Sequence, residues 1–366
     1  MTESRLGAAV IGCGGIGEAH ARALSLMPEV RIVAACDVDA ARAEALRDRY
    51  GATVAHTDAA PILARDDVDF VVITTAPDSH APLTIQALDA GKHALVQKPM
   101  ALNLTEADAM IAAAERAQKK LMISFFEFFH PAFKRAKEVV DQGLIGDVFL
   151  LKAIMAWYSP STAAWRFDPR VSGGGIVMDG HVHHVAFFLW LLGSPEIETV
   201  YSEFGALNSG APVEDTGVTL IRTKSAIAEI SGSNRLIEPN AQSGRMFKEQ
   251  VEIFGSAGVI HIHPTERPSL RVFSEKISLE KPLGGGWVAP ALDFVPFTER
   301  GRSMHFNAEE DPWVGEHRHF VQCIREDTPV ISDGRFGRRV LEVLMAGYQS
   351  GAERRAIRLP LANTGR

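Results

Sequence analysis

The sequence predicts an α/β protein in which a doubly wound parallel sheet is followed by a second domain with a large, mostly antiparallel open sheet. Three observations lead to this fold class. The first 125 residues alternate short apolar runs with stretches of helical spacing. A glycine-rich turn joins the first apolar run to the first helical stretch. Longer strands of alternating apolar and polar residues then dominate the rest of the chain.

The N-terminal domain is expected to span residues 1–125. Its predicted strands are continuous apolar runs, as in a sheet covered on both faces, at residues 8–11, 32–35, 70–74, 94–96 and 121–124. Helical spacing predicts the connecting helices at residues 16–26, 40–49, 82–90 and 106–118. Strand–helix alternation of this length implies right-handed βαβ units and therefore a parallel sheet.

The C-terminal domain is expected to span residues 126–366. Its predicted strands alternate apolar and polar residues, as in an antiparallel sheet with one exposed face, at residues 148–157, 199–204, 216–223, 226–231 and 250–254. Residues 223–225 are expected to form a hairpin turn between two of these strands. Helices are predicted at residues 132–142, 176–192, 313–326 and 336–353, and the Gly- and Pro-rich residues 284–305 are expected to form a loop.

Composition limits the classes of function. The chain has 366 residues, enough for two domains. A net charge of -7 and the lack of a Lys/Arg run argue against nucleic acid as a partner. No apolar run approaches the roughly 18 residues that cross a bilayer, and the polar N-terminus lacks a signal-peptide core. The three cysteines show no metal or disulfide spacing, so we expect a cytoplasmic protein.

The turn after the first predicted strand fits a dinucleotide-binding fingerprint. Gly12, Gly14 and Gly17 occupy the glycine positions of G-x-G-x-x-G, between a strand and a helix as the motif requires. They permit a tight turn, close approach of a pyrophosphate and close packing of helix on strand. Asp37 ends the second strand, where a carboxylate can bind the adenosine ribose and repel a 2′-phosphate. These residues predict a Rossmann domain that binds NAD rather than NADP.

Two other places carry residues suited to alcohol oxidation. Lys98 follows a predicted core strand and precedes Pro99, at the sheet edge where open α/β folds bind ligands. Its ammonium group can stabilise negative charge that develops on an oxygen. Asp179 and His183 are four residues apart on a predicted helix and so share a face. His183 suits the role of a base near neutral pH, and Asp179 suits that of orienting its imidazole.

Several motifs together resemble the Gfo/Idh/MocA oxidoreductase family, which includes glucose–fructose oxidoreductase and inositol dehydrogenases. They are G-C-G-G-I-G-E-A-H at 12–20, T-A-P-D-S-H at 75–80, A-G-K-H-A-L-V-Q-K-P at 90–99, W-R-F-D-P at 165–169, G-G-G-I-V-M-D-G-H-V-H at 173–183 and L-E-V-L-M-A-G-Y at 341–348. The resemblance covers essentially the whole chain. It implies a Rossmann domain followed by a domain for substrate binding and oligomerisation. A homo-oligomer, dimer or tetramer, is expected, because an open sheet face commonly pairs with another copy.

The resemblance also implies which residues form the site. Those expected at the NAD cofactor are Gly12, Gly14, Gly15, Ile16, Gly17, Asp37, Thr75, Ala76, Pro77, His80, Gln97 and Lys98. Those expected at the substrate are Lys98, Glu127, Trp165, Arg166, Asp179, His183 and His184, of which Lys98, Asp179 and His183 are expected to be catalytic. Gln97 stands where the family has a glutamate. The aromatic residues 125–129 either stack on an apolar part of the substrate or fill the domain interior.

No metal site is expected, although three histidines lie close together in the sequence. His181 and His183 point to different faces of the predicted helix, and no third ligand joins His181 and His184. The predicted reaction is hydride transfer between NAD and a secondary alcohol or ketone of a sugar, cyclitol or glycoside. Two alternatives stay open. In the first, tightly bound NAD is recycled and the net reaction is glycoside cleavage, elimination or epimerisation. In the second, the protein is a non-catalytic sensor of dinucleotide and sugar.

Overall fold

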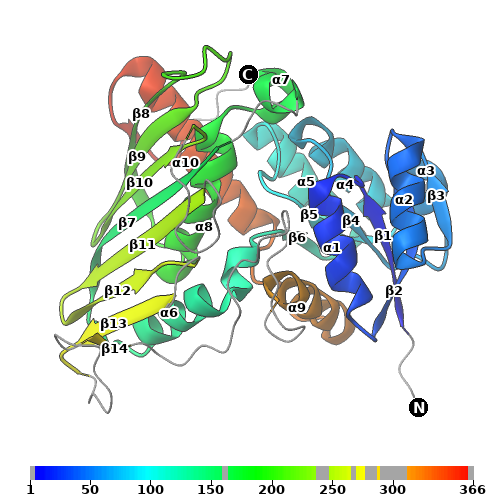
Figure 1. Ribbon diagram of the computed structural model, residues 1–366, viewed down its shortest axis with the longest axis horizontal. Coiled ribbons are helices and arrows are strands. Elements are labelled where there is room, and N and C mark those ends of the chain that lie inside the picture. Colours follow the sequence, from blue (N-terminus) through cyan, green and yellow to red (C-terminus); the bar gives the residue numbers. More distant parts are fainter. Residues whose placement is uncertain are drawn as a thin grey trace. The chain divides into compact units, whose positions relative to one another are not determined.

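The computed structural model describes residues 5–158, 164–235, 247–264, 269–276, 287–288 and 311–361. The chain divides into two compact units, which are both seen in Figure 1. Unit 1 comprises Met1–Phe126 and Asn307–Leu341, and unit 2 comprises Glu127–Phe306 and Glu342–Arg366. Among the described residues, no helix is both long and apolar enough to cross a membrane.

Unit 1 is built on a six-stranded parallel sheet of order β3-β2-β1-β4-β5-β6. The strands are β1 (Leu6–Ile11), β2 (Val30–Cys36), β3 (Val54–His56), β4 (Phe70–Ile73), β5 (His93–Val96) and β6 (Leu121–Ile123). The helices are α1 (Gly15–Ser25), α2 (Ala40–Tyr50), α3 (Ala60–Leu63), η1 (Pro77–Ser79), α4 (His80–Asp89), α5 (Leu104–Ala117), α9 (Pro312–Glu326) and the start of α10 (Gly334–Glu353). The strands other than the half-buried edge strand β3 are almost fully buried, because α1 packs with α2 and α9 while α4 packs with α5 on the other face of the sheet.

The order of the strands reverses at β1, which lies between β2 and β4. β1 ends at Ile11 and leads into Gly12, and Ile73 at the end of β4 is its direct neighbour. In open α/β sheets, ligands bind beyond the carboxyl ends of the strands at such a reversal. The topology therefore places the glycine-rich turn where a dinucleotide is expected.

The sequence predictions for unit 1 are largely confirmed. All predicted strands and helices of residues 1–125 are present, with ends shifted by at most two residues. The short elements β3 and α3 are not predicted, because so few residues show no period. The expected boundary lies within one residue of Phe126, but the expectation that residues 126–366 form one continuous domain is wrong for Asn307–Leu341. This segment returns to unit 1 because α9 packs against α1.

Unit 2 is built on a nine-stranded sheet of order β14-β13-β12-β11-β7-β10-β9-β8-β15, in which β7 and β10 are parallel and the other pairs antiparallel. The strands are β7 (Val148–Trp157), β8 (Ile197–Gly205), β9 (Thr216–Thr223), β10 (Ile227–Ser233), β11 (Phe247–Gly255), β12 (Gly258–Ile262), β13 (Leu270–Ser274), β14 (Trp287–Val288) and β15 (Ile357–Arg358). The helices are η2 (Phe126–Phe129), α6 (Pro131–Asp141), η3 (Ala164–Phe167), α7 (Pro169–Ser172), η4 (Val177–His181), α8 (Val182–Leu191) and the end of α10. Figure 1 shows α6, α8 and the end of α10 on one face of this sheet.

The predictions for unit 2 are also mostly confirmed. Every predicted strand is present, and the hairpin after β9 is closed by the Thr223 amide, which donates to the Ala226 carbonyl at 2.9 Å. The strands β12, β13 and β15 are not predicted. The predicted helix at residues 176–192 is present, but its first turn is a π-helix. The loop expected at residues 284–305 lies outside the described residues except for β14.

Candidate active site

The glycine-rich turn of unit 1 has the backbone geometry that a dinucleotide needs. Gly12 has φ +98°, and a Cβ there would lie 2.7 Å from the carbonyl carbon of Thr74. A Cβ on Gly17 would lie 1.9 Å from the Gly12 oxygen, so helix and turn approach as only glycine permits. A Cβ on Gly14 would meet nothing within 4 Å. α1 begins directly after Gly14 with no side-chain cap, so its first amides are open to phosphate oxygens.

Asp37 follows β2 and is bound to the glycine-rich turn. Its Oδ2 accepts a hydrogen bond from the Cys13 amide at 2.7 Å, and its Oδ1 accepts one from the Asp39 amide at 2.9 Å. Burial, and then the charge of Asp37, raise the pKa of the Cys13 thiol to about 12, so Cys13 stays protonated at neutral pH. The side chain of Val38 beside it is 94% exposed. The carboxylate is therefore fixed beside the phosphate-binding turn, where its charge opposes a 2′-phosphate.

The loop after β4 contains Thr75, Ala76 and Pro77, and the ring of His80 makes a hydrogen bond to it. His80 is 1% exposed, with Nδ1 2.8 Å from the Pro99 carbonyl oxygen and Nε2 3.1 Å from the Thr75 carbonyl oxygen. Burial lowers the pKa of His80. The ring thus joins the loop after β4 to the loop after β5, and its burial argues against the direct cofactor contact expected from the sequence.

Gln97, at the carboxyl end of β5, is turned into the interior of unit 1. Its Nε2 donates to Ser124 Oγ at 2.9 Å and lies 2.8 Å from His20 Nε2. Ser124 in turn donates to Glu316 Oε2 at 2.9 Å, and His20 Nδ1 lies 2.9 Å from His317 Nε2. All five side chains are buried. Gln97 therefore anchors the end of its strand, and this burial argues against the cofactor contact expected from the sequence.

Lys98 lies directly after this anchored residue, at the carboxyl edge of the parallel sheet. β5 is the neighbour of β4, which is the neighbour of β1, so Lys98 and the glycine-rich turn share this edge. Lys98 is partly exposed. The position expected from the sequence is confirmed to this extent, while its catalytic role stays a prediction.

The partners of Gln97 on α9 are residues that sequence reasoning missed. Glu316 and His317 lie between Trp313 and Phe320, which are buried on the same helix. A spacing of three to four residues places all of them on the buried face of a helix. A glutamate and a histidine at apolar-face positions were the available signal, because buried polar side chains require partners.

In unit 2, Asp179 and His183 lie where a π-helix joins an α-helix. In η4 the hydrogen bonds run from residue i to i+5, and the helix continues as α8 from Val182. The Arg166 Nε lies 3.5 Å from Asp179 Oδ2, and Glu127 Oε1 is in contact with His183 Nδ1. Glu127, which the sequence analysis expected at the substrate, thus places a carboxylate against the imidazole, and the expected orienting role of Asp179 stays a prediction.

The glycine run before this helix makes a close backbone approach within the protein itself. Gly174 has φ +155°, and a Cβ there would lie 1.8 Å from the Tyr348 hydroxyl. Glu214 Oε1 accepts hydrogen bonds from the amides of Gly175 and Val177, at 2.8 and 3.1 Å, and from the Tyr348 hydroxyl at 2.7 Å. The run therefore seats the start of η4 on Glu214 and Tyr348, and this fixes the turn that carries Asp179.

Trp165 and Arg166 belong to η3 and form a polar surface with Asp179. The Arg166 guanidinium lies 4.5 Å from the centroid of the Trp165 ring. The side chains of Arg166 and Asp179 are 36% and 34% exposed, so both are accessible to a ligand. This arrangement agrees with the expected substrate-facing position of the three residues, which stays a prediction.

The other two histidines of this helix are interior. His184 is 1% exposed, with Nε2 3.3 Å from Glu249 Oε1, and the substrate contact expected for it stays a prediction. His181 is fully buried, with Nδ1 3.0 Å from Thr219 Oγ1, and burial lowers its pKa to about 3. Within the described residues, no group of three or more His, Cys, Asp or Glu side chains is arranged to hold a metal ion.

Three of the four phenylalanine rings of residues 125–129 are buried or stacked on another ring of their own unit. Phe125 and Phe128 are each 2% exposed. In unit 1 the Phe126 ring stacks on Trp313 at 4.6 Å, and in unit 2 the Phe128 ring stacks on Trp190 at 4.6 Å. Of the two interpretations left open, the structure therefore favours packing over stacking on a substrate for these rings.

Comparison with known proteins agrees with both halves of this description. Residues 6–125 match the model described as oxidoreductase family, NAD-binding Rossmann fold, and residues 133–261 match the GFO/IDH/MocA C-terminal domain. Myo-inositol 2-dehydrogenase of Thermotoga maritima is 27% identical over 355 residues, covering 96% of this chain and 97% of the relative. D-apiose dehydrogenase of Paraburkholderia graminis is 27% identical over 361 residues, covering 98% and 91%.

A solved structure shows the same architecture over its whole length. GenD2 from gentamicin A biosynthesis, in complex with NAD, has a TM-score of 0.82 at 27% identity and covers 99% of this chain and 98% of its own. Levoglucosan dehydrogenase with NADH shares the fold, with a TM-score of 0.85 at 22% identity, covering 98% of this chain and 100% of its own. With the family models matching both units, the chain belongs to the Gfo/Idh/MocA oxidoreductase family, and its N-terminal Rossmann domain binds NAD.

Proposed function

We propose that the protein is an NAD-dependent dehydrogenase or reductase that acts on a secondary alcohol or ketone of a sugar, cyclitol or glycoside. The observation that carries this proposal is the imidazole of His183, which is held by a buried carboxylate in a chain with an NAD-binding domain. The relatives named above support the substrate class, since two of them are dehydrogenases of inositol and apiose.

The residues of unit 1 fit the cofactor. Gly14 leaves open space where the pyrophosphate would approach, and Asp37 stands at the turn where the adenosine ribose would lie. We propose that NAD is held by the turn, by Asp37, and by the ends of β4 and β5, through Gly12, Gly14, Gly15, Ile16, Gly17, Asp37, Thr75, Ala76, Pro77 and Lys98.

In the proposed oxidation, one C–H bond and one O–H bond of the substrate are broken. NAD, when bound, would supply the acceptor of a hydride from that carbon, or its donor in the reverse direction. His183 takes the hydroxyl proton during oxidation and gives it back during reduction. Lys98 donates a hydrogen bond to the same oxygen and stabilises the negative charge that develops there. Asp179 adds a negative charge to the helix of His183, and this charge favours the imidazolium that forms.

A substrate screen tests this function. Wild-type protein is mixed with NAD and with cyclitols, aldoses, anhydrosugars and glycosides, and NADH absorbance is followed. We expect turnover with at least one class. Lys98→Met is expected to leave NADH binding measurable by fluorescence titration, because the glycine-rich turn and Asp37 are unchanged, and to lose roughly 10²-fold or more in kcat. Near-wild-type kcat in this variant contradicts the role of Lys98, and bound NADH that never accumulates in solution identifies the recycling alternative.

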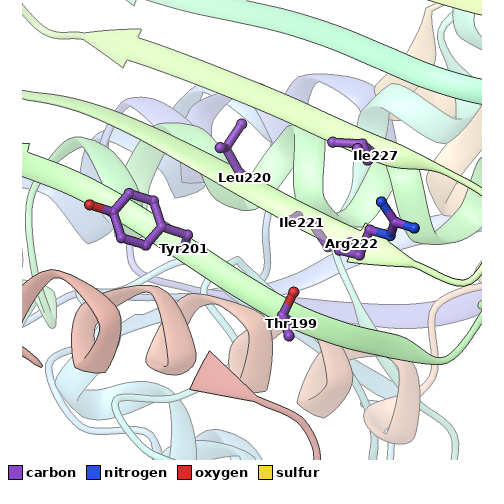
Figure 2. Close-up of a pocket in the computed structure, with 6 residues that line it drawn as sticks. All are labelled: Thr199, Tyr201, Leu220, Ile221, Arg222 and Ile227. Atoms are coloured by element: carbon purple, nitrogen blue, oxygen red, sulfur yellow. The ribbon is translucent and has the colours of Figure 1, made fainter. Parts of the chain in front are cut away.

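We also infer that the protein is a homo-oligomer that pairs through the exposed face of the unit 2 sheet. Val218, Leu220 and Ile227 are apolar side chains on this face that remain at least 36% exposed. A pocket lies there, and Figure 2 shows the residues that line it: Thr199, Tyr201, Leu220, Ile221, Arg222 and Ile227. Leu220→Asp is expected to convert a dimer or tetramer to a monomer in light scattering. The same change at Leu207, which is 77% exposed in a loop, is the control. A monomeric wild type contradicts the inference.

A cytoplasmic location is proposed as well. The three cysteines, Cys13, Cys36 and Cys323, are free, as is usual for proteins of reducing compartments. Fractionation of the native host with antibodies to the protein tests this location, and recovery outside the cytoplasm contradicts it.

A further inference from the structure

A buried glutamate lies against the ring of His183. Glu127 belongs to η2, and its Oε1 is in contact with Nδ1 of His183. The side chain of Glu127 is 4% exposed and that of His183 is 11% exposed. Phe128, the next residue, stacks on Trp190 of α8 with ring centroids 4.6 Å apart and an interplanar angle of 14°. This packing fixes η2 against the helix that carries His183, so the carboxylate has a defined position.

The burial of this carboxylate distinguishes it from a surface ion pair. An ionised carboxylate that is removed from water requires a charged or hydrogen-bonding partner, because desolvation alone disfavours its charge. Nδ1 of His183 is shielded from solvent as well. The accessible part of the ring therefore lies away from Nδ1. His183 faces the glutamate with Nδ1, and the exposed part of its side chain belongs to the remainder of the ring.

The adjacent histidine provides the contrast. His184 faces Glu249 with its other ring nitrogen, Nε2, at 3.3 Å. Its side chain is 1% exposed, so neither ring nitrogen is accessible to a ligand. Two neighbouring histidines thus each face a glutamate, but only the His183 pair leaves part of the ring accessible.

We propose that Glu127 is the positioning residue of His183: it accepts the Nδ1 proton and so leaves Nε2 as the nitrogen that takes the substrate proton. This inference rests on the proposed function, in which His183 is the base. When Nε2 takes the hydroxyl proton, the hydride leaves the same carbon for the nicotinamide, and the products are a ketone, reduced cofactor and an imidazolium. The carboxylate of Glu127 stabilises that imidazolium, as a carboxylate does behind other catalytic histidines. Glu127 acts through His183 and is not the substrate contact expected from the sequence.

Four variants test the proposal. Glu127→Met removes the acceptor at similar size, whereas Glu127→Gln keeps an oxygen that can accept the Nδ1 proton without the charge. Glu249→Met and Glu249→Gln are the matched controls on His184. Circular dichroism and NADH titration first establish that each variant is folded and binds cofactor. The tautomer of His183 is then read from the ¹⁵N shifts and long-range couplings of its ring, assigned with His183→Ala, and kcat is measured with the best substrate of the screen.

We expect the neutral His183 ring of the wild type to carry its proton on Nδ1. Glu127→Met should lose this preference and about 10²–10⁴-fold in kcat, by analogy with the loss of other orienting carboxylates. Glu127→Gln should keep the tautomer and recover part of kcat, and the Glu249 variants should leave both within about twofold. A wild-type ring protonated on Nε2, or a folded Glu127→Met variant with unchanged tautomer and kcat, overturns the proposal. Because the tautomer is measured without turnover, an Nδ1–H ring in a protein that oxidises no substrate would refute the proposed function alone.

Discussion

Replacing Gln97 by glutamate, the residue usual in the family, is expected to destabilise unit 1 in a pH-dependent way. Burial lowers the pKa of His20, and lowers that of His317 to about 3, so both rings are neutral at pH 7. The Gln97 Nε2 can only donate, so His20 Nε2 accepts and its Nδ1 donates to His317. The single hydroxyl proton of Ser124 goes to Glu316, so Ser124 also accepts from Gln97. Both protons of the Gln97 amide are therefore in use.

A carboxylate at position 97 carries no proton that it could donate to His20 Nε2 or to Ser124 Oγ. The two histidines can exchange tautomers together, because the outer Nδ1 of His317 has no hydrogen-bond partner among the described residues. The Ser124 hydroxyl, however, cannot serve two carboxylates with one proton. The introduced carboxyl is therefore expected to stay protonated in the folded protein, with its pKa above the unfolded value of about 4.3.

The magnitude follows from linkage. When the pKa of a carboxyl is higher in the folded state, its contribution to the free energy of unfolding is complete below about pH 4.3. This contribution is lost as the pH rises toward the folded-state pKa. The loss is about 1.4 kcal/mol per pH unit. Relative to wild type, Gln97→Glu should therefore lower the free energy of unfolding by ~1 kcal/mol at pH 5 and by up to ~3.7 kcal/mol at pH 7.

Urea unfolding between pH 5 and pH 8 measures this difference. Gln97→Met, which loses both hydrogen bonds without adding an ionisable group, should show a deficit that does not change with pH. Gln86→Glu, the same substitution at an exposed position of α4, should stay close to wild type throughout. If the deficit of Gln97→Glu is the same at every pH, the introduced carboxyl ionises freely and the assigned proton positions are wrong.

Three further predictions concern other parts of the molecule. Asp37→Asn keeps an oxygen for the Cys13 amide but removes the charge. Like charges ~4 Å apart repel by about 1 kcal/mol even in water, so NADPH binding should gain roughly fivefold relative to NADH in fluorescence titrations, and an unchanged ratio contradicts this. Because burial lowers the pKa of His181 and His317 to about 3, the unfolded chain binds protons that the folded chain does not. Stability should therefore fall by about 1.4 kcal/mol per pH unit for each ring below ~pH 6.5, and a flat urea midpoint from pH 7 to pH 5 would argue against neutral buried rings. Gly174→Ala should lower the free energy of unfolding by about 2 kcal/mol or more, since its Cβ would meet the hydroxyl of the α10 tyrosine at 1.8 Å, and an unchanged midpoint would refute the close approach.

The sequence by itself determined the architecture of unit 1 and most strands of unit 2. Apolar runs and helical spacing are local patterns, because the spacing of apolar residues within each element indicates which of its faces is buried. The glycine fingerprint and Asp37 were equally readable, because their role depends on backbone conformation and on strand order, which the right-handed crossover rule restricts. Lys98 could be placed at the sheet edge for the same reason.

Only the tertiary structure decided which polar side chains meet. His20 and His317 are 297 residues apart in sequence, and Glu127 reaches His183 from a different helix, so no local pattern pairs them. The i, i+4 rule pointed to Asp179 as the partner of His183, but no such rule could point to Glu127, whose carboxylate lies against the ring. Burial is a property of the folded chain, and it is what gives Gln97, His80 and His184 hydrogen-bond partners in the interior. A buried polar group must find a partner, and which partner it finds depends on packing between elements that the sequence leaves far apart.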